Sequence, residues 1–316
     1  MSARRKGHVV YLSGGVGGAR FAHGLAHVLA PERLTLIVNT GDDFVHWGLS
    51  IAPDLDTVMY TLANLADVAR GWGLAQETFE TLAAVTRYGG ETWFQLGDRD
   101  LATHLMRSQW LRQGESLTAV TARLCRTLGV QATVLPMSDQ PCQTMIDTQS
   151  AGTLMFQHWL VQQRAQPAVR RVWFRSEGGE TRASSAVLAA LEAAEFAILG
   201  PSNPYVSIDP ILALPGVRER LAALPVIAIS PIVHGQAIKG PLASMLQTLA
   251  GVEPSARSIV QHYAPLLAAM VVEHGDQIGI SELPVLATAT VMHTRQNSCT
   301  LAQQVLQFAG ELGFAT

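Results

Sequence analysis

Residues 8–20, HVVYLSGGVGGAR, decide the fold of this chain. An apolar run precedes a cluster of glycines, and residues 19–29 then carry apolar side chains at helical spacing. This order predicts a strand, a tight loop and a helix. Glycines let a backbone approach an anion closely, and the free N–H groups at a helix start favour a diphosphate. The stretch therefore predicts a phosphate-binding loop.

A dinucleotide-binding loop and a plain tight turn are the alternatives for this stretch. In the dehydrogenase fingerprint G-x-G-x-x-G, Gly15 and Gly17 supply the first two glycines, but the third position is Arg20. The next predicted strand, residues 34–38, is followed by Asn39 rather than by the acidic residue that binds a ribose. The chain has no G-x-x-x-x-G-K-[ST] motif, which disfavours an ATPase P-loop. A nicotinamide cofactor is therefore disfavoured, while a turn without a ligand stays open.

The composition is typical of a well-buried globular protein. Of the 316 residues, 48% are apolar and 15% are charged, and the formal net charge is −3. The compact basic cluster Arg4-Arg5-Lys6 stands at the N-terminus, and no basic stripe indicates a nucleic-acid partner. No apolar run reaches the length of a membrane span, and the run after the basic cluster is too short for a signal peptide. We expect a cytoplasmic protein without a membrane partner.

The three cysteines, Cys125, Cys142 and Cys299, are far apart and form no C-x-x-C pair. This spacing fits reduced thiols and argues against a zinc cluster. We expect each cysteine to be a small core residue rather than a nucleophile.

Acidic residues gather after the second predicted strand, between residues 40 and 57. In an α/β sheet, such a loop faces the ligand crevice at the carboxyl ends of the strands. Asp42 and Asp43 offer the hard oxygen ligands that Mg²⁺ combines with substrate phosphate oxygens. The simpler alternatives are a solvated turn for Asp42 and Asp43, an N-cap role for Asp54 and a first-turn position for Asp56.

The segment from residue 57 to residue 129 carries no convincing strand pattern. Residues 77–88, 101–113 and 118–128 show helical periodicity, which predicts a helical insertion over the sheet at about residues 61–129. Asp98 stands at an N-cap position, and Asp100 and His104 share one helix face at i, i+4 spacing. These three residues form either a capped, exposed charged turn or a rim of acid and base groups that meets a polar substrate.

The second half of the chain returns to alternating strands and helices. Strands are predicted at residues 130–135, 169–175, 196–199, 226–229 and 284–287, and helices at residues 184–195, from residue 242 and at residues 299–312. This alternation implies an α/β fold with a Rossmann-like, doubly wound, mostly parallel sheet. We expect one domain over residues 1–316, with its core in residues 1–60 and 130–316.

Two polar loops follow predicted strands in this half. Residues 200–204, GPSNP, come after one strand, and residues 230–241, which include Ser230 and Lys239, come after the next. Turn residues explain the first loop without a ligand. The length of the second favours a ligand-binding role, with Lys239 as a candidate phosphate contact or a solvated lysine.

Six blocks of the sequence resemble the CofD/FbiA family, the 2-phospho-L-lactate transferases of coenzyme F420 biosynthesis. They are SGGVGGAR at 13–20, GDD at 41–43, PDLDT at 53–57, LGDRD at 96–100, GPSNP at 200–204 and SPI at 230–232. The blocks occur in the order of the family and span most of the chain. The resemblance also implies a Rossmann-like core with a helical subdomain and a homodimer.

The resemblance implies a Mg²⁺-dependent reaction. The ribityl hydroxyl of the deazaflavin Fo attacks the diphosphate of a guanylylated three-carbon acid, so that a phosphodiester forms and GMP leaves. By similarity, the metal carboxylates belong to the blocks 41–43 and 53–57, with Asp42, Asp43 and Asp56 as the candidate ligands. A hydroxyl nucleophile also benefits from a base, and Asp56, Asp98 and Asp100 are the unranked candidates. The expected substrate-binding residues are Gly14, Gly15, Gly17, Gly18, Arg20, Asp54, Arg99, His104, Ser202, Asn203 and Ser230.

Two questions stay open at the level of sequence. The transferred acid is 2-phospholactate, phosphoenolpyruvate or 3-phosphoglycerate. The sequence does not decide among the three, because they differ by small groups that only the shape of the pocket distinguishes. The alternative function is a non-enzymatic regulator that resembles the gluconeogenesis-factor relatives of this fold, which bind nucleotide sugars.

Overall fold

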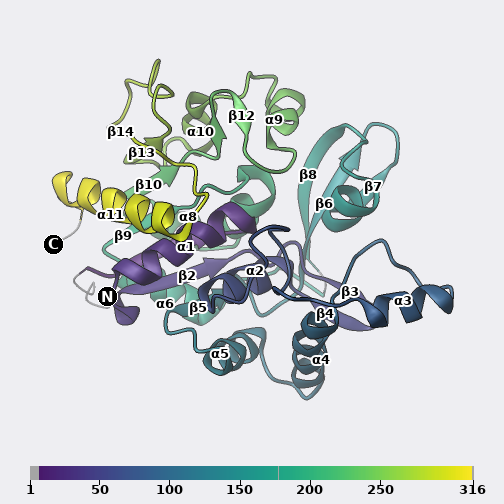
Figure 1. Cartoon of the computed structure of the whole chain (residues 1–316). Coiled ribbons are helices and arrows are strands. Elements are labelled where there is room, and N and C mark those ends of the chain that lie inside the picture. Colours follow the sequence, from purple (N-terminus) through teal and green to yellow (C-terminus); the bar gives the residue numbers. More distant parts are fainter. Residues whose placement is uncertain (1–6, 177, 315–316) are drawn as a thin grey trace.

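A seven-stranded parallel sheet forms the centre of the computed structural model, which describes residues 7–176 and 178–314 (Figure 1). The basic cluster Arg4-Arg5-Lys6 lies outside the described residues. The strand order is β14-β13-β10-β9-β1-β2-β5, and neighbouring strands pair in parallel. The strands are β1 (Val9–Ser13), β2 (Leu34–Val38), β5 (Thr133–Pro136), β9 (Phe196–Leu199), β10 (Val226–Ile229), β13 (Ala269–Val272) and β14 (Val285–Ala287).

The order of the strands reverses at β1. From β1 the chain proceeds outward through β2 to β5, returns at β9 on the other side of β1, and then proceeds outward through β10, β13 and β14. The carboxyl ends of β1 and β9 therefore meet at the point where the winding direction changes. In open α/β sheets this switch point is where a crevice for ligands forms.

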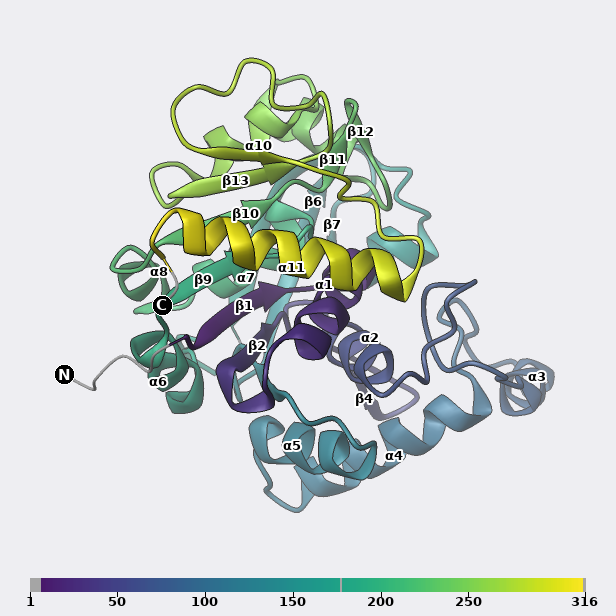
Figure 2. The same cartoon turned by 60° about the vertical axis from the view of Figure 1, so that its left-hand side comes forward.

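Helices cover both faces of the sheet (Figures 1 and 2). The side chains of β1 alternate between the two layers, because Val9 and Tyr11 enter one core and Val10 and Leu12 enter the other. The first layer contains α1 (Gly15–Val28), α2 (Pro53–Leu62), α5 (Leu117–Thr127) and α11 (Arg295–Glu311). The second layer contains α6 (Ser185–Ala193), α7 (Asp209–Leu212), α8 (Val217–Leu221) and α10 (Ala256–Tyr263). This arrangement confirms the predicted α/β class.

A separate three-stranded antiparallel sheet corrects the prediction for residues 169–175. It is built from β6 (Cys142–Thr148), β7 (Thr153–Met155) and β8 (Val169–Ser176), with β6 in the middle. The segment was expected in the alternation of the parallel sheet, and that expectation is wrong. Only Val169 of β8 is fully buried, so its arginine-rich pattern suits a sheet with one solvated face. The four-residue strand β13 was not predicted, because such a short apolar run carries little periodicity.

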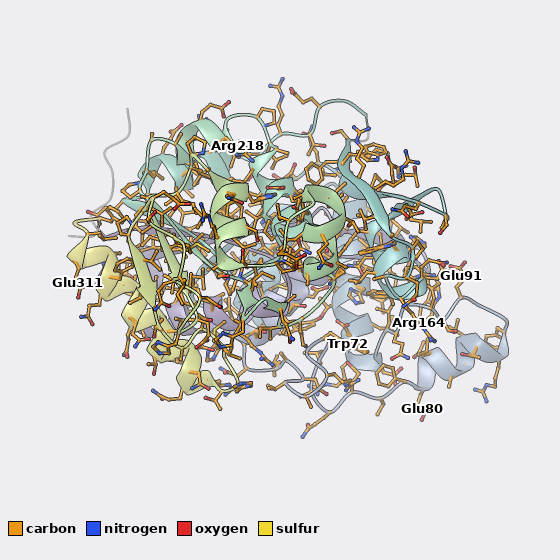
Figure 3. The ribbon with its side chains drawn as sticks, turned by 90° about the horizontal axis from the view of Figure 1, so that it is seen from above. Trp72, Glu80, Glu91, Arg164, Arg218 and Glu311 are labelled. Atoms are coloured by element: carbon orange, nitrogen blue, oxygen red, sulfur yellow. The ribbon has the colours of Figure 1, made fainter. Side chains whose placement is uncertain are left out.

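The helices predicted between residues 77 and 128 are present. They are α3 (Glu80–Arg87), α4 (Asp98–Arg112) and α5. Helix α3 projects from one end of the molecule, and the labelled Glu80 and Glu91 lie at that end, opposite Glu311 of α11 (Figure 3). The division of the chain at residues 60 and 130 stays a prediction.

Short elements complete the chain. No helix among residues 7–176 and 178–314 is long and apolar enough to cross a membrane. The short elements are β3 (Phe44–His46), β4 (Leu49–Ile51), β11 (Ile232–Val233), β12 (Gln236–Ala237) and α9 (Leu242–Met245), with helical turns at Pro31–Arg33, His158–Gln162, Pro204–Ile208 and Leu246–Ala250.

Candidate active site at the switch point of the sheet

A cavity of about 350 Å³ lies at the switch point. Its wall combines the glycine loop after β1, the loops after β9 and β10, and a segment that precedes α11. These four parts of the chain, which are distant in sequence, therefore meet around one space together with Asp42, Asp54 and residues 156–160. The predicted site residues on this wall are Gly14, Gly15, Gly17, Arg20, Asp42, Asp54, Ser202, Asn203 and Ser230.

The glycine loop presents backbone N–H groups to this cavity. The N–H of Gly14 donates to Ser202 Oγ (3.2 Å), and the N–H of Gly15 donates to Asp54 Oδ1 (2.7 Å). A helix start leaves four N–H groups without intrahelical partners. Because Gly14 caps α1, the N–H groups of Val16 and Gly17 remain for a ligand. Val16 was missed, because the sequence pattern drew attention to glycines although an amide of any residue can donate.

Close packing of two loops explains why glycines occupy this turn. A Cβ on Gly17 would lie 2.8 Å from the carbonyl oxygen of Pro201, and a Cβ on Gly18 would lie 2.7 Å from Ser202 Oγ. Gly15 has φ +67°, a conformation that other residues rarely adopt. Gly18 therefore lets the loop after β9 pack against α1, whereas Gly17 both packs and faces the cavity.

Asp54 joins the glycine loop to the end of β2. The residue was considered as an N-cap, and that expectation is wrong, because Ala52 is the N-cap of α2 and Asp54 lies in its first turn. One carboxylate oxygen accepts from Gly15, and the other accepts from Asn39 Nδ2 (2.9 Å). Asn39 also orders the next loop, since its Oδ1 accepts from the N–H of Gly41 (2.8 Å). The asparagine that argued against a dehydrogenase thus positions a carboxylate at the cavity.

Asp42 and Asp43 carry buried carboxylate oxygens without compensation. Oδ1 of each has no hydrogen-bond partner in the part of the chain that the structure describes. Burial and the neighbouring Asp54 carboxylate raise the pKa of Asp42 well above its usual value. Burial also raises the pKa of Asp43 well above its usual value, against the opposing effect of Arg107. The solvated-turn alternative is excluded for Asp42, which is 6% exposed.

These carboxylates suit a hard cation. Asp42 and Asp54 line the same cavity, and the hydroxyl oxygens of Thr40 and Thr144 are likewise buried without partners among the described residues. Burying like charges together is unfavourable unless a proton or a cation compensates them. Oxygen donors with room for phosphate oxygens and water fit Mg²⁺.

Asp56 points into a second, compensated cluster. Both of its carboxylate oxygens accept from the Arg107 guanidinium, one at 3.0 Å, and His104 Nδ1 lies 3.7 Å from Asp56 Oδ2. On the other side of the imidazole, Nε2 lies 3.4 Å from Asp100 Oδ1, which also accepts from the Tyr60 hydroxyl at 2.5 Å. The structure thus brings the predicted Asp56, Asp100 and His104 together.

Arg107 was missed by the sequence prediction, although a signal existed. It follows Asp100 and His104 on α4 at i, i+4, i+7 spacing and therefore lies on the same helix face. Donor atoms of Asp56, Asp100 and His104 lie within 4.8 Å of one another, a spacing that a metal ion could use. Because Arg107 already neutralises Asp56, a metal there would have to displace a buried guanidinium, so the structure disfavours Asp56 as a metal ligand.

Asp98 binds the start of the projecting helix α3 and Arg99 binds the segment before it, and neither residue is on the cavity wall. Gly97, not Asp98, is the N-cap of α4, so that expectation is wrong. The Asp98 carboxylate instead accepts from the Thr78 hydroxyl (2.6 Å) and from the N–H of Glu80 (2.9 Å), and these bonds lower its pKa. Arg99 donates to the carbonyl oxygen of Ala75 (2.7 Å). Both side chains bind a segment that is distant in sequence.

Cations and polar groups complete the far wall of the cavity. The Arg20 guanidinium donates to the carbonyl oxygen of Met292 (2.8 Å), which fixes it beside the glycine loop. Lys239 also lines the cavity, and burial together with Arg20 lowers its pKa. Ser230 donates to the carbonyl oxygen of Ile232 (2.8 Å) and so orders the loop after β10. This wall favours an anionic ligand.

An aromatic cluster adjoins the carboxylates and was not singled out in the sequence. It begins at Phe44, directly after Asp43, and the ring centroids of Phe44 and Phe94 lie 4.9 Å apart. The ring centroids of Trp93 and His158 lie 4.5 Å apart, and Phe156 and Gln157, which precede His158 in the sequence, line the cavity. The aromatic cluster is Phe44, His46, Trp47, Trp93, Phe94 and His158. Such rings can stack on a planar ligand.

Comparisons with known proteins agree on one family. The model of the family described as 2-phospho-L-lactate transferase CofD matches residues 9–295. The phosphoenolpyruvate transferase of Thermobifida fusca is 39% identical over 96% of this chain and 98% of its own. The 2-phospho-L-lactate transferase of Methanosarcina mazei is 38% identical over 95% of this chain and 99% of its own.

A solved structure shares the fold. A UPF0052 family protein from Bacillus halodurans has a TM-score of 0.63 and 16% sequence identity, and the match covers 96% of this chain and 100% of that chain. This likeness concerns the fold alone. Because the family model and the relatives both span nearly the whole sequence, the chain belongs to the CofD family of transferases.

Proposed function

We propose that this chain acts in coenzyme F420 biosynthesis. It transfers a phospho-three-carbon-acid moiety from its guanosine diphosphate adduct to the ribityl hydroxyl of the deazaflavin Fo and releases GMP. The observation that carries the proposal is the cavity in which amides at a helix start face the buried carboxylates Asp42 and Asp54, neither of which pairs with a cation among the described residues. Relatives named for 2-phospholactate and for phosphoenolpyruvate support both acids as candidates, beside 3-phosphoglycerate.

The diphosphate of the donor binds at the start of α1. The N–H groups of Val16 and Gly17 donate to its oxygens, and the positive end of the helix dipole adds to this attraction. Arg20 and Lys239 supply positive charge from the same cavity wall. Donors fixed before the ligand arrives stabilise the charge that develops during phosphoryl transfer.

Asp42 and Asp54 hold Mg²⁺ in this proposal, and Asp43 lies beside them. The bound ion would neutralise charge on the phosphate oxygens. Asp54 also accepts from Gly15, so the carboxylate that faces the ion is tied to the loop that faces the phosphate. Asp56 keeps its partner Arg107 and orients the second cluster instead.

The acceptor binds against the aromatic cluster, with Asp43 as the general base. The ribityl hydroxyl oxygen forms a bond to the phosphorus that carries the three-carbon acid, the bond from that phosphorus to the GMP oxygen breaks, and the hydroxyl proton passes to Asp43. Burial raises the pKa of Asp43, and a general base is more effective when its pKa is raised toward the working pH. Asp98 is engaged in capping α3, and Asp100 is engaged with Tyr60 and His104, which makes both weaker candidates. A homodimer in the cytoplasm is part of the same proposal.

A turnover assay tests the proposal. Purified protein, Fo and Mg²⁺ are combined with each of the three guanylylated acids, and GMP and the phosphodiester are measured. We expect both products in equal amounts from at least one donor, and neither product after Mg²⁺ is removed by a chelator.

Two variants serve as the negative and matched controls of this assay. Asp42→Asn is expected to lose most of its activity, whereas Asp98→Asn changes a carboxylate outside the cavity and is expected to retain turnover. Absence of product with every donor, combined with binding of guanine or uridine nucleotides, would refute the transferase and favour a nucleotide-binding regulator.

A further inference from the structure

Helices α1 and α11 approach each other closely at Gly24. A Cβ on Gly24 would lie 2.1 Å from the carbonyl oxygen of Ser298, so the backbone of α11 rests directly against α1. This approach brings Cys299 of α11 beside His23 and His27, which are four residues apart on α1. One donor atom from each of these three residues lies within 4.8 Å of the other two.

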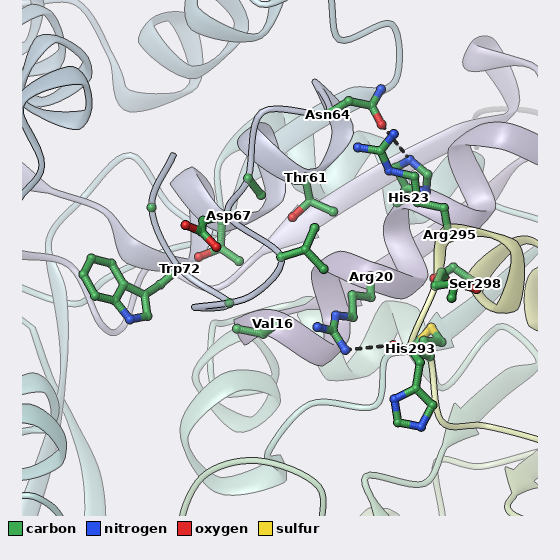
Figure 4. Close-up of a pocket in the computed structure, with 17 residues that line it drawn as sticks. Val16, Arg20, His23, Thr61, Asn64, Asp67, Trp72, His293, Arg295 and Ser298 are labelled. Carbon is green, nitrogen blue, oxygen red and sulfur yellow. Dashed lines mark hydrogen bonds between the residues drawn. The ribbon is translucent and has the colours of Figure 1, made fainter. Parts of the chain in front are cut away.

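Hydrogen bonds fix which nitrogen of each histidine carries the proton. His23 Nε2 lies 3.1 Å from Asn64 Oδ1, an acceptor, so this nitrogen donates and Nδ1 keeps a lone pair (Figure 4). That Nδ1 is buried and has no hydrogen-bond partner in the described part of the chain. His27 Nδ1 lies 3.0 Å from the carbonyl oxygen of His23, so Nδ1 donates there and Nε2 keeps the lone pair. Histidines that bind metals are oriented in this way by a partner on the other nitrogen.

The charges near the three residues suit a thiolate-bound cation. His23 is buried, and burial, His27 and Arg295 lower its pKa although the hydrogen bond to Asn64 raises it, so the surroundings favour the neutral imidazole that a metal ligand requires. The positive charge of Arg295 disfavours a cation at this position. The negative charge of a Cys299 thiolate would offset it. His27 is exposed and Cys299 is partly exposed, so an ion can enter from solvent.

We propose that His23, His27 and Cys299 bind Zn²⁺, with a fourth position open to water. Two imidazole nitrogens and one thiolate sulfur suit Zn²⁺ and not Mg²⁺, which prefers oxygen ligands. Binding forms one Zn–S and two Zn–N bonds and releases the thiol proton to solvent. The site is separate from the proposed Mg²⁺ site and does not depend on the proposed reaction.

A zinc ion at this position would link the helix that carries the glycine loop to the last helix of the chain. The cysteine spacing argued against a zinc cluster, because a sequence pattern detects ligands that are close along the chain. Here the ligands come from two helices that are joined by tertiary packing. The expected consequence is that Zn²⁺ raises the melting temperature of the whole chain by mass action.

Co²⁺ is the spectroscopic probe for the test. The full-length, metal-free protein is titrated with Co²⁺ in excess Mg²⁺, and the sulfur-to-cobalt charge-transfer band is recorded before Zn²⁺ is added. We expect one equivalent of Co²⁺ to produce the band and one equivalent of Zn²⁺ to remove it. Cys299→Ser is expected to abolish the band, and His27→Ala to abolish stoichiometric binding.

A variant next to the ligands distinguishes a metal site from a histidine pair that binds no metal. Asn64 has φ +61°, so Asn64→Gly keeps the backbone conformation and removes only the acceptor for His23. We expect this variant to bind Co²⁺ about 10–100-fold more weakly. His274→Ala, which changes an exposed histidine elsewhere, and Cys125→Ala are the matched controls and are expected to bind as the wild type does.

Either of two results would overturn the zinc site. One is the absence of a charge-transfer band in a wild-type protein that is folded by circular dichroism. The other is a band of unchanged intensity in Cys299→Ser. Turnover is not a readout here, so failure of the proposed reaction would leave this test intact.

Discussion

Asp54 and Asp56 stand two residues apart on α2 and reach opposite electrostatic environments. Two residues along a helix turn the side chain by about 200°. Asp54 therefore faces the cavity beside the like charge of Asp42, whereas Asp56 faces α4 and is neutralised by Arg107. The cavity cluster, Asp42 and Asp54, lacks a protein cation as direct partner among the described residues, and the α4 cluster contains one.

This difference distinguishes carboxylates that bind a ligand from carboxylates that stabilise the fold. A carboxylate that the fold has already paired with a cation contributes to packing of the two helices. A buried carboxylate with no such partner is a place where a ligand cation is needed. Asp43 lies between the two clusters, because Arg107 lowers its pKa while Asp54 and Asp56 raise it.

Asp42→Asn is expected to have the largest effect, because it removes a carboxylate from the cavity cluster. We expect kcat/KM to fall about 10³-fold, which corresponds to about 4 kcal/mol of transition-state stabilisation. Steady-state kinetics over a range of Mg²⁺ concentrations measure this effect. A wild-type rate at saturating Mg²⁺ would show that Asp42 is not needed to hold the ion.

Arg107→Met breaks the α4 cluster rather than the cavity cluster. It leaves Asp56 buried without its partner, and we expect a loss of about 3–5 kcal/mol in the free energy of unfolding. The double variant Asp56→Leu with Arg107→Met is expected to recover most of that stability, since it removes both charges. Urea unfolding of the two variants checks this, and equal instability of both would contradict it.

Asp43→Asn tests the residue between the two clusters. As a general base, Asp43 contributes about 10²-fold or more to kcat. We expect kcat to fall by that factor with little change in the KM for the donor or in the Mg²⁺ requirement, and the acidic limb of the pH profile of kcat to disappear. A variant that instead requires much more Mg²⁺ would assign Asp43 to the metal.

The metal-free protein should reveal the raised pKa of Asp42 through its stability. A carboxyl whose folded pKa lies above its unfolded value binds the proton more tightly when folded. Its stabilising contribution is therefore complete below the unfolded pKa of about 3.9 and is lost as the pH rises through the folded pKa.

Melting temperatures measured from about pH 3.9 upward test this loss of stability. We expect metal-free Asp42→Asn to lose less stability than the wild type on going to higher pH, by about 2–4 °C for each kcal/mol involved. Added Mg²⁺ should stabilise the wild type at high pH. Identical pH profiles for the two metal-free proteins would argue against a raised pKa.

Asp98→Ala is expected to have the smallest effect. It removes the acceptor for the hydroxyl of Thr78 and the N–H of Glu80, so the start of α3 loses its cap. We expect a small decrease in melting temperature with kcat unchanged. A large decrease in kcat with an unchanged melting temperature would restore Asp98 as a catalytic candidate.

The sequence by itself determined most strands of the central sheet and the glycine loop. The buried strands at residues 196–199 and 226–229 lie where their apolar runs predict them, because turn residues follow each run directly. The clustered glycines after β1 likewise predict the turn at the start of α1. These signals are local, since each depends on residues that are adjacent along the chain.

Only the tertiary structure decided which partner each charged side chain has. Asp54 accepts from Gly15, 39 residues away, and Asp56 pairs with Arg107, 51 residues away. In the same way, the packing of two distant helices brings Cys299 to His23 and His27. Helical periodicity places a carboxylate on a face of its helix, but its charge state and role depend on the side chain that the folded chain places opposite, which no local pattern encodes.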